Sequence, residues 1–363
     1  MIIMNDHDLW EKLKTETRPI VIYGISDAAE KIAGILESNG CKISGVMASD
    51  GFVRDRDFLG HKLKSMSQLE AEFLSDGERS TKGDFIILLC FGSHRADVID
   101  NIKSIAKKHD LYAPDLPVIG SGLFDYDYYK NHKNDFDKLN AILADDQSRK
   151  VLENTIQYKL SGKLDFLFDC ETPEEEGWLL AIGNSTNHCK SLLDLGAYTG
   201  DTADLFARLV PDYKFIYAVE PESRNFRKLK EYADGWRNIF CFNLGIGDRS
   251  EIVAFPKGNG RGSTSKKTTP VEFTSVDELI KGKNTDDLLI KMDLEGWECK
   301  AIDGAQKIIS ELHPNLYIAA YHRLDDLLEI PKKVLSLNPD YKLYLRHSPC
   351  IPAWEMNYIF VDS

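Results

Sequence analysis

The sequence predicts an α/β protein with two doubly wound parallel sheets, and three observations support this class. An apolar strand leads through a turn into a helix at residues 19–38, and a second unit of this kind occupies residues 192–209. After each unit, apolar strands continue to alternate with amphipathic helices. The chain has 363 residues, which is the length of two domains that each bury a core.

The first half of the chain has the order of a Rossmann-like domain. Its strands and helices are expected at residues 19–24, 27–38, 42–47, 84–91, 95–109 and 116–120. The turn after the first strand reads Gly24-x-Ser26-x-Ala28, where a dinucleotide-binding turn has its glycines. Because this glycine pattern is incomplete, we expect the domain to be a scaffold or to bind another small group.

A helical segment is expected to separate the two sheets. Residues 136–160 have helical apolar spacing with a break near residue 146, where Asp146 or Ser148 is expected to cap the second helix. A further helix is expected over residues 174–182, with acids in its first turn. The predicted units are an N-terminal Rossmann-like domain (1–125), a helical connector (126–185) and a C-terminal domain (186–363).

The C-terminal domain opens with a buried strand that ends in a glycine-containing turn. This segment reads Asp194-Leu195-Gly196-Ala197-Tyr198-Thr199-Gly200-Asp201. Glycines at such a turn let backbone N–H groups and a helix N-terminus approach a ligand. The D-x-G-x-x-x-G spacing has fewer glycines than a turn that cradles a pyrophosphate, so it favours S-adenosylmethionine over NAD. We expect Asp194 to anchor the turn or to reach the cofactor amine through water, and Asp201 to cap the helix.

Two further strand ends are expected to complete the cofactor site. Glu220-Pro221 follows the strand at 215–219, about 25 positions after Gly196, where an acid hydrogen-bonds the ribose hydroxyls. The next strand ends in Asn243-Leu244-Gly245, a position that lies beside the adenine. Asn243 is expected to bond the adenine or the backbone nearby.

Acids and a histidine follow two later strands. Asp293 and Glu295 end the apolar strand at 288–292, and His322 follows the strand at 316–321. Ligands bind outside the carboxyl ends of such strands, so these three side chains are expected to converge. His322 is the expected catalytic base toward an acceptor hydroxyl, because the carboxylates would need raised pKa values. Asp293 is assigned to positioning the cofactor and the acceptor, and Glu295 to supporting either neighbour.

The C-terminal domain has further candidate ligand residues. His322, Asp293 and Glu295 could together bind a divalent cation, which would lower the pKa of the acceptor hydroxyl. A metal is not favoured, because the sequence has no tight ligand spacing such as H-x-x-x-H. Arg346 and His347 follow another strand and are expected to face a charged group of the acceptor. The glycine-rich loop at 258–263 is expected to be a lid or a plain hairpin loop.

Composition narrows the classes of partner. A net charge of -13 argues against a nucleic acid or an anionic membrane as the main partner. No apolar run is long enough to span a membrane, and no signal peptide is evident. The seven cysteines are scattered without a C-x-x-C pair, which favours reduced thiols in the cytoplasm. We therefore expect a cytoplasmic protein that acts on a small molecule.

Three segments of the C-terminal domain carry a family pattern. They are the turn at 193–201, the strand end at 217–221, and Ile290-Lys291-Met292-Asp293-Leu294-Glu295-Gly296, in which Lys-x-Asp-x-Glu-Gly is the most specific feature. Together they resemble the FkbM family of S-adenosylmethionine-dependent methyltransferases, over roughly residues 140–362. The resemblance implies a class I methyltransferase sheet of seven strands and methylation of a hydroxyl, often on a sugar or a natural product.

Two other functions stay open. A nucleotide-sugar oxidoreductase or epimerase would also use two Rossmann-like halves, but the chain lacks paired G-x-G-x-x-G turns. The second is a non-catalytic protein that keeps the cofactor fold, against which Asp293, Glu295 and His322 speak. Transfer to nitrogen is disfavoured, because no Asn-Pro-Pro-aromatic signature follows the strand at 288–292.

Overall fold

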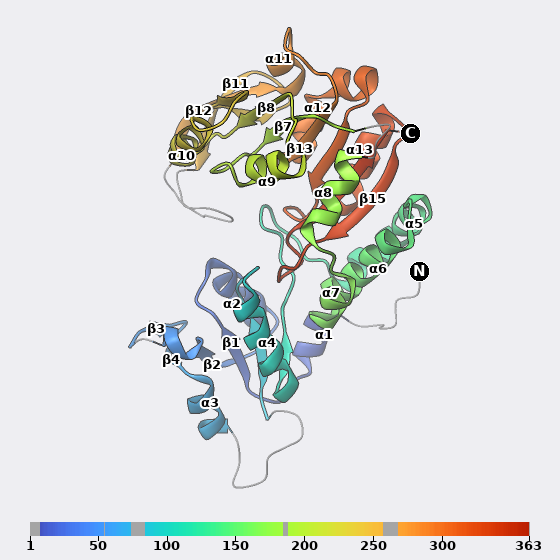
Figure 1. Ribbon diagram of the computed structural model, residues 1–363. Helices are drawn as coiled ribbons and strands as arrows, with labels where there is room; N and C mark the ends of the chain where they lie inside the picture. The colour runs from blue at the N-terminus through green and yellow to red at the C-terminus, as the bar shows by residue number, and fades with distance from the viewer. Residues whose placement is uncertain (1–7, 54, 74–83, 184–187, 257–267, 363) are drawn as a thin grey trace.

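The predicted fold class is confirmed by the computed structural model, which describes residues 8–53, 55–73, 84–183, 188–256 and 268–362. A seven-stranded sheet and a smaller Rossmann-like domain are joined by a helical connector (Figure 1). The glycine-rich loop at 258–263 lies outside the described residues. Among the described helices, none combines the length and the apolar character that a membrane span requires.

The N-terminal domain contains a six-stranded sheet in the order β3-β4-β2-β1-β5-β6. All neighbouring strands run parallel except β3 and β4. The strands are β1 (Ile20–Tyr23), β2 (Ile43–Met47), β3 (Asp57–Phe58), β4 (His61–Lys64), β5 (Ile86–Leu89) and β6 (Asp110–Tyr112). The helices are α1 (Leu9–Lys14), α2 (Asp27–Ser38), the short 3-10 helix η1 (Asp50–Phe52), α3 (Met66–Phe73) and α4 (Ala96–Lys108). The strand expected at 116–120 was wrong, because the sheet ends with β6 and residues 116–120 lie beyond it.

Four helices form the connector: α5 (Tyr126–Ile142), α6 (Asp146–Ser161), α7 (Asp165–Cys170) and α8 (Glu174–Ile182). In Figure 1 the green helices α5, α6 and α7 run from the seven-stranded sheet down to the N-terminal domain. The predicted cap of α6 was displaced by one residue. Asp145 is the N-cap, and its carboxylate accepts the backbone N–H of Ser148 at 2.8 Å.

The seven-stranded sheet has the order β15-β16-β14-β13-β7-β8-β9. Strand β16 runs antiparallel to both of its neighbours, β15 and β14, and the other pairs of neighbouring strands are parallel. The strands are β7 (Ser191–Leu195), β8 (Phe215–Val219), β9 (Ile239–Phe242), β13 (Leu288–Met292), β14 (Asn315–Ala319), β15 (Lys342–His347) and β16 (Met356–Val361). The central strands β7, β8, β13 and β14 are buried throughout, as apolar runs in a parallel sheet predict.

Helices and a small sheet complete the C-terminal domain. The helices are α9 (Asp201–Leu209), α10 (Ser223–Ala233), α11 (Val276–Ile280), α12 (Glu298–Asp303), the π-helix η2 (Ile308–Leu312) and α13 (Asp326–Leu337). A three-stranded sheet contains β10 (Gly245–Gly247), β11 (Glu251–Pro256) and β12 (Thr268–Ser275).

The register of the seven-stranded sheet positions the site. Lys291 of β13 lies opposite Asp194 of β7, and Met292 lies opposite Leu195. Both strands therefore end at the same level, and the backbone N–H of Asp293 donates to the carbonyl of Leu195 at 3.0 Å. The glycine turn after β7 and the acids after β13 consequently begin side by side.

Backbone hydrogen bonds join the described parts of the N-terminal and C-terminal domains at Ser93 and at Ile119. Ser93, after β5, and Ile351, between β15 and β16, form an antiparallel bridge with N–H···O distances of 2.7 and 3.0 Å. Farther along, the backbone N–H of Ile119 donates to the carbonyl of His322 at 2.9 Å. The segment predicted as a strand at 116–120 is thus a contact between domains.

Candidate active site

The turn after β7 is built so that only glycine fits at its first position. Gly196 has a φ of +87°, and a Cβ there would overlap the carbonyl oxygen of Asp293. Gly200 has a φ of +100°, and its Cβ would lie 2.6 Å from the ring of Tyr232. Gly200 occupies the N-cap position of α9, so the prediction that Asp201 caps this helix was wrong. Asp201 instead places an acid in the first turn.

Glu220 is fixed at the carboxyl end of β8 facing this turn. Its Oε2 accepts the backbone N–H of Tyr198 at 3.0 Å, and its Oε1 accepts that of Glu222 at 2.9 Å. The side chain of Asn243 donates to the backbone carbonyls of Glu220 and Pro221 at 2.8 and 3.1 Å. Of the two predicted partners, the adenine and the nearby backbone, the structure has the backbone. Burial raises the pKa of Glu220 to about 7, although the two N–H groups oppose this change.

A buried ion pair supports the turn from below. Lys291 Nζ lies 3.2 Å from Asp194 Oδ1 and donates to the carbonyl of Gly196 at 2.9 Å. Burial raises the pKa of Asp194 to about 6, and Lys291 opposes this rise. Asp194 is fully buried, so it anchors the turn through Lys291, and direct contact with the cofactor amine is not supported. Sequence reasoning gave Lys291 no role, although a lysine inside an apolar strand signals a buried partner.

His322 lies at the centre of the predicted catalytic group. Its Nε2 is 3.4 Å from Asp293 Oδ1 and 3.7 Å from Glu295 Oε2, so the structure brings the three residues together. Its Nδ1 is 2.9 Å from Oε1 of Glu298, which sequence reasoning missed. Glu298 starts α12, where an acid normally signals only a favourable helix start.

The surroundings of His322 argue against its predicted role as the base. Burial lowers the pKa of the imidazole, but the negative charges of Glu298, Asp293 and Glu295 outweigh this effect. The resulting pKa is about 9, above the ordinary value of 6.5. The ring is therefore protonated near neutral pH, and its exposed fraction is 0%. The side chains of Asp293 and Glu295 are 26% and 40% exposed. Burial and protonation of the ring give no support to His322 as the base, and its catalytic role stays a prediction.

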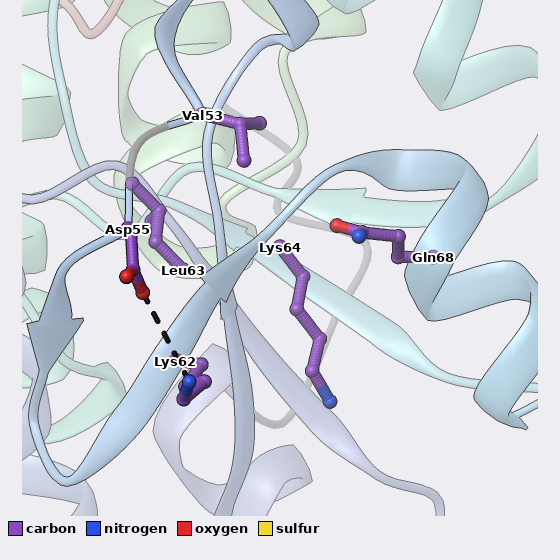
Figure 2. Close-up of a pocket in the computed structure, with 6 residues that line it drawn as sticks. All are labelled: Val53, Asp55, Lys62, Leu63, Lys64 and Gln68. Atoms are coloured by element: carbon purple, nitrogen blue, oxygen red, sulfur yellow. Dashed lines mark ion pairs between the residues drawn. The ribbon is translucent and has the colours of Figure 1, made fainter.

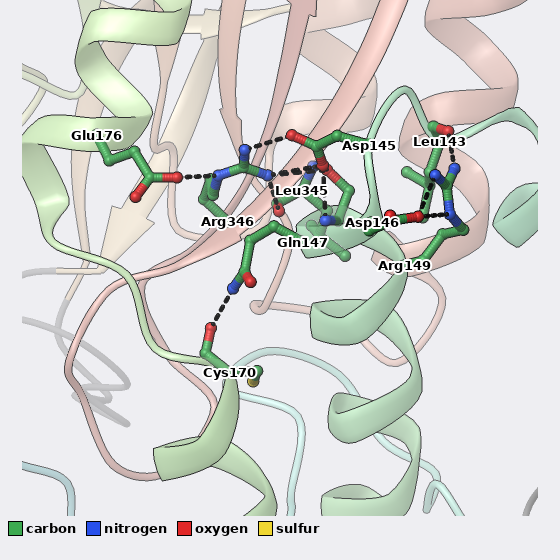
Figure 3. Close-up of polar contacts among 10 residues, drawn as sticks. Leu143, Asp145, Asp146, Gln147, Arg149, Cys170, Glu176, Leu345 and Arg346 are labelled. Carbon is green, nitrogen blue, oxygen red and sulfur yellow. Dashed lines mark hydrogen bonds and ion pairs between the residues drawn. The ribbon is translucent and has the colours of Figure 1, made fainter.

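Arg346 and His347 are both buried within the protein. Figure 3 shows the guanidinium of Arg346 between Asp145 and Glu176. Arg346 Nε donates to Glu176 at 2.9 Å, and Nη2 donates to Asp145 at 2.6 Å, so the arginine ties α6 and α8 to β15. His347 is fully buried, and burial lowers its pKa to about 4. These surroundings give no support to the expectation that the two residues face the acceptor, which stays a prediction.

The remaining predicted cofactor residues have mixed surroundings. Tyr198 is half exposed and has a φ of +47°, whereas Ala197 is fully buried. Thr199 and Leu244 are partly buried. Gly245 is buried against the ring of Phe273, which leaves no room for a side chain, so packing explains this glycine.

The N-terminal turn at Gly24 is filled by the protein itself. A Cβ at Gly24 would lie 2.8 Å from the ring of Phe91, and the Ser26 hydroxyl donates to the carbonyl of Cys90. A pocket of this domain lies elsewhere, with a volume of about 350 Å³ beside β4 (Figure 2). It is lined by Val53, Asp55, Lys62, Leu63, Lys64 and Gln68. That the domain is a scaffold or binds another small group stays a prediction.

The strand order, the single antiparallel strand and the glycine turn beside acid-bearing strand ends define the C-terminal domain as a class I methyltransferase-type domain. Residues 194–341 match the family described as Methyltransferase FkbM domain, so this part of the chain is an FkbM-type methyltransferase domain. The chain is therefore a methyltransferase, and this finding displaces the oxidoreductase alternative. No curated protein matches the chain.

Solved structures extend the similarity of fold to the N-terminal domain. The structure of Methyltransferase FkbM from Methylobacillus flagellatus KT is 21% identical, with a TM-score of 0.70, and covers 95% of this chain and 90% of its own. Aeropyrum pernix fibrillarin in complex with S-adenosyl-L-methionine (15% identity, TM-score 0.35, 52% of this chain, 74% of that chain) is more distant. So is a putative O-methyltransferase from Klebsiella pneumoniae (13%, 0.34, 64% and 97%).

Proposed function

We propose that the protein transfers a methyl group from S-adenosylmethionine to a hydroxyl group of a small molecule, such as a sugar or a natural product. One observation carries this proposal. Gly196 of the turn packs on the backbone carbonyl of Asp293, so the expected cofactor turn adjoins the cluster of Asp293, Glu295 and His322. A methyl donor in the turn would thus face carboxylates that an acceptor can reach.

The residues around the turn fit the chemistry of S-adenosylmethionine. The two carboxylate oxygens of Glu220 each accept a backbone N–H, which fixes the carboxylate at the strand end where two neighbouring ribose hydroxyls would bind. The methionine half carries a sulfonium and an ammonium group. Asp201 and Asp293 both lie close enough to Asp194 to add to the effect of burial on its pKa, so this edge of the sheet favours cations.

Bound S-adenosylmethionine would supply an electrophilic methyl carbon. Asp293 would position the acceptor hydroxyl toward that carbon, and positioning supplies most of the rate in such a displacement. Glu295 would accept the proton of the hydroxyl. His322 lies within 3.4 Å of Asp293 and 3.7 Å of Glu295, and Glu298 lies 2.9 Å from the other side of its ring. The domain boundaries and the cytoplasmic location stay predictions.

The proposal is tested by following the methyl group. Mass spectrometry of small molecules retained by the purified protein would direct a panel of sugar and polyketide alcohols, assayed with methyl-labelled S-adenosylmethionine. We expect label in an ether product, and we expect Glu295→Gln to lower kcat while S-adenosylhomocysteine still binds. Label found only in amine or thiol acceptors would contradict the assignment to hydroxyl groups.

A further inference from the structure

We propose that Asp293, Glu298 and His322 bind a divalent cation at the edge of the candidate active site. One ligand atom from each residue lies within 4.8 Å of the other two. The sequence-based alternative used Glu295 in place of Glu298, and a metal was not favoured because the ligands are not closely spaced in the chain. The fold supplies the proximity, because β13, α12 and the end of β14 meet at this edge.

Glu298 gives the first independent indication of a ligand. Its exposed fraction is 1%, and its Oε1 accepts the backbone N–H of Leu294 at 2.6 Å. Its other oxygen, Oε2, is buried and has no hydrogen-bond partner within the described part of the chain. A buried carboxylate oxygen without a partner is costly, and a bound cation would remove that cost.

The imidazole of His322 gives the second indication. Its Nδ1 lies 2.9 Å from Glu298 Oε1, yet neither ring nitrogen makes a hydrogen bond of acceptable geometry among the described residues. Only one of the two nitrogens would be the ligand, and binding of a cation would displace the proton that the ring carries in the free protein. One imidazole with two carboxylates suits ions such as Mn²⁺, Zn²⁺ or Fe²⁺, and three protein ligands leave positions open.

The catalytic role of this cation rests on the proposed function. Asp293 is the solvent-facing ligand, so an acceptor oxygen would bind at an open position beside it. A cation lowers the pKa of a bound hydroxyl, and a carboxylate such as Glu295 then suffices to accept the proton. Without the cation, Glu295 would have to deprotonate an ordinary alcohol.

Binding of Mn²⁺ alone to the chelator-treated full chain tests the site, by calorimetry and electron paramagnetic resonance. We expect one ion per chain. Asp293→Asn, Glu298→Gln and His322→Gln should each weaken binding by at least about 100-fold, beyond the 10- to 100-fold typical of outer-shell residues. The matched control is Asp326→Asn, which removes a buried carboxylate that accepts the backbone N–H of Arg323 instead. It should weaken binding by less than about tenfold.

Binding of S-adenosylhomocysteine to the same samples separates the two proposals. Should the wild type bind S-adenosylhomocysteine but no Mn²⁺, or should Asp293→Asn and Glu298→Gln keep wild-type affinity for Mn²⁺, the metal site is refuted while the proposed function stands. Binding of Mn²⁺ without S-adenosylhomocysteine supports the metal site and contradicts the proposed cofactor. Asp293 is partly exposed, so its variant is expected to fold even if the Glu298 variant does not.

Discussion

The pH affects Glu220 in two ways: a rise in pH lowers its contribution to stability and increases its expected affinity for the cofactor ribose. Its carboxyl group is buried, and its folded-state pKa of about 7 lies above the ordinary value of 4.5. The charged form is thus disfavoured in the free protein. The stability that this raised pKa contributes is fully present below pH 4.5, where the carboxyl group is protonated, and it is lost as the pH rises through about 7. The charged form is nevertheless the better acceptor for two ribose hydroxyls.

Affinity for S-adenosylhomocysteine should therefore increase as pH rises from 6 to 8 through the pKa of about 7. Glu220→Gln should weaken binding by about 10- to 100-fold, since hydrogen bonds to a charged group contribute about 1.5–3 kcal/mol each. It should also flatten the pH dependence. Calorimetric titration at several pH values measures both effects, with Glu231→Gln on the exposed face of α10 as the control. A pH slope that survives in Glu220→Gln would assign the titration to another group.

Lys291 is the only cation that the described residues place beside the fully buried Asp194. Lys291→Met should therefore lower the free energy of unfolding by about 3–5 kcal/mol, because it leaves an unpaired buried carboxylate. Asp194→Asn combined with Lys291→Met should recover part of that loss. Urea denaturation of the single and double variants measures the difference. A loss in the double variant equal to the sum of the losses in the two single variants would show that the pair is not coupled.

The turn between β7 and α9 works because its first glycine touches the next strand end. Gly196→Ala should abolish binding of S-adenosylhomocysteine, because its Cβ would displace the carbonyl of Asp293. Gly282→Ala is the matched control: its φ is +71°, but no atom lies within 4 Å of its Cβ. It should cost only the backbone strain of about 1–2 kcal/mol and leave binding unchanged. Similar affinities in the two variants would remove the turn from the cofactor site.

Elements with a strong local pattern were predictable from the sequence, and those defined by long-range contacts were not. The helix expected at 27–38 is α2, because its apolar spacing is regular. The apolar run at 116–120 is only partly buried, and it forms no strand. Ile119 lies near Gly296 and its backbone N–H donates to the carbonyl of His322, so the segment contacts the C-terminal domain instead of pairing in a sheet.

The same distinction applies to the site. Asp293, Glu295 and His322 follow neighbouring strands, and sheet topology alone predicts their convergence. Glu298 was missed because an acid in the first turn of a helix has an ordinary explanation. Arg346 was misassigned because its partners, Asp145 and Glu176, lie about 170 to 200 residues earlier in the chain, and no local pattern reveals them.

The two domains meet at the carboxyl end of the N-terminal sheet. Gly92 faces the ring of Trp354 so closely that a Cβ would overlap it. Gly92→Ala should therefore loosen the bridge between Ser93 and Ile351, and hydrogen exchange of these two amides should become faster. Gly34→Ala in α2, with no atom within 4 Å of its Cβ, should instead stabilise the protein by about 0.5–1 kcal/mol. Unchanged exchange in Gly92→Ala would show that this contact does not couple the domains.

We propose that the edge formed by β7, β8 and β13 binds the methyl donor. A crystal structure of the full chain with S-adenosylhomocysteine is the most direct test of this binding site. We predict ribose hydroxyls on the carboxylate of Glu220, the backbone of the Gly196–Gly200 turn around the amino-acid half, and the sulfur directed toward Asp293. Density for the ligand at any other place, such as the N-terminal turn at Gly24, would contradict the account.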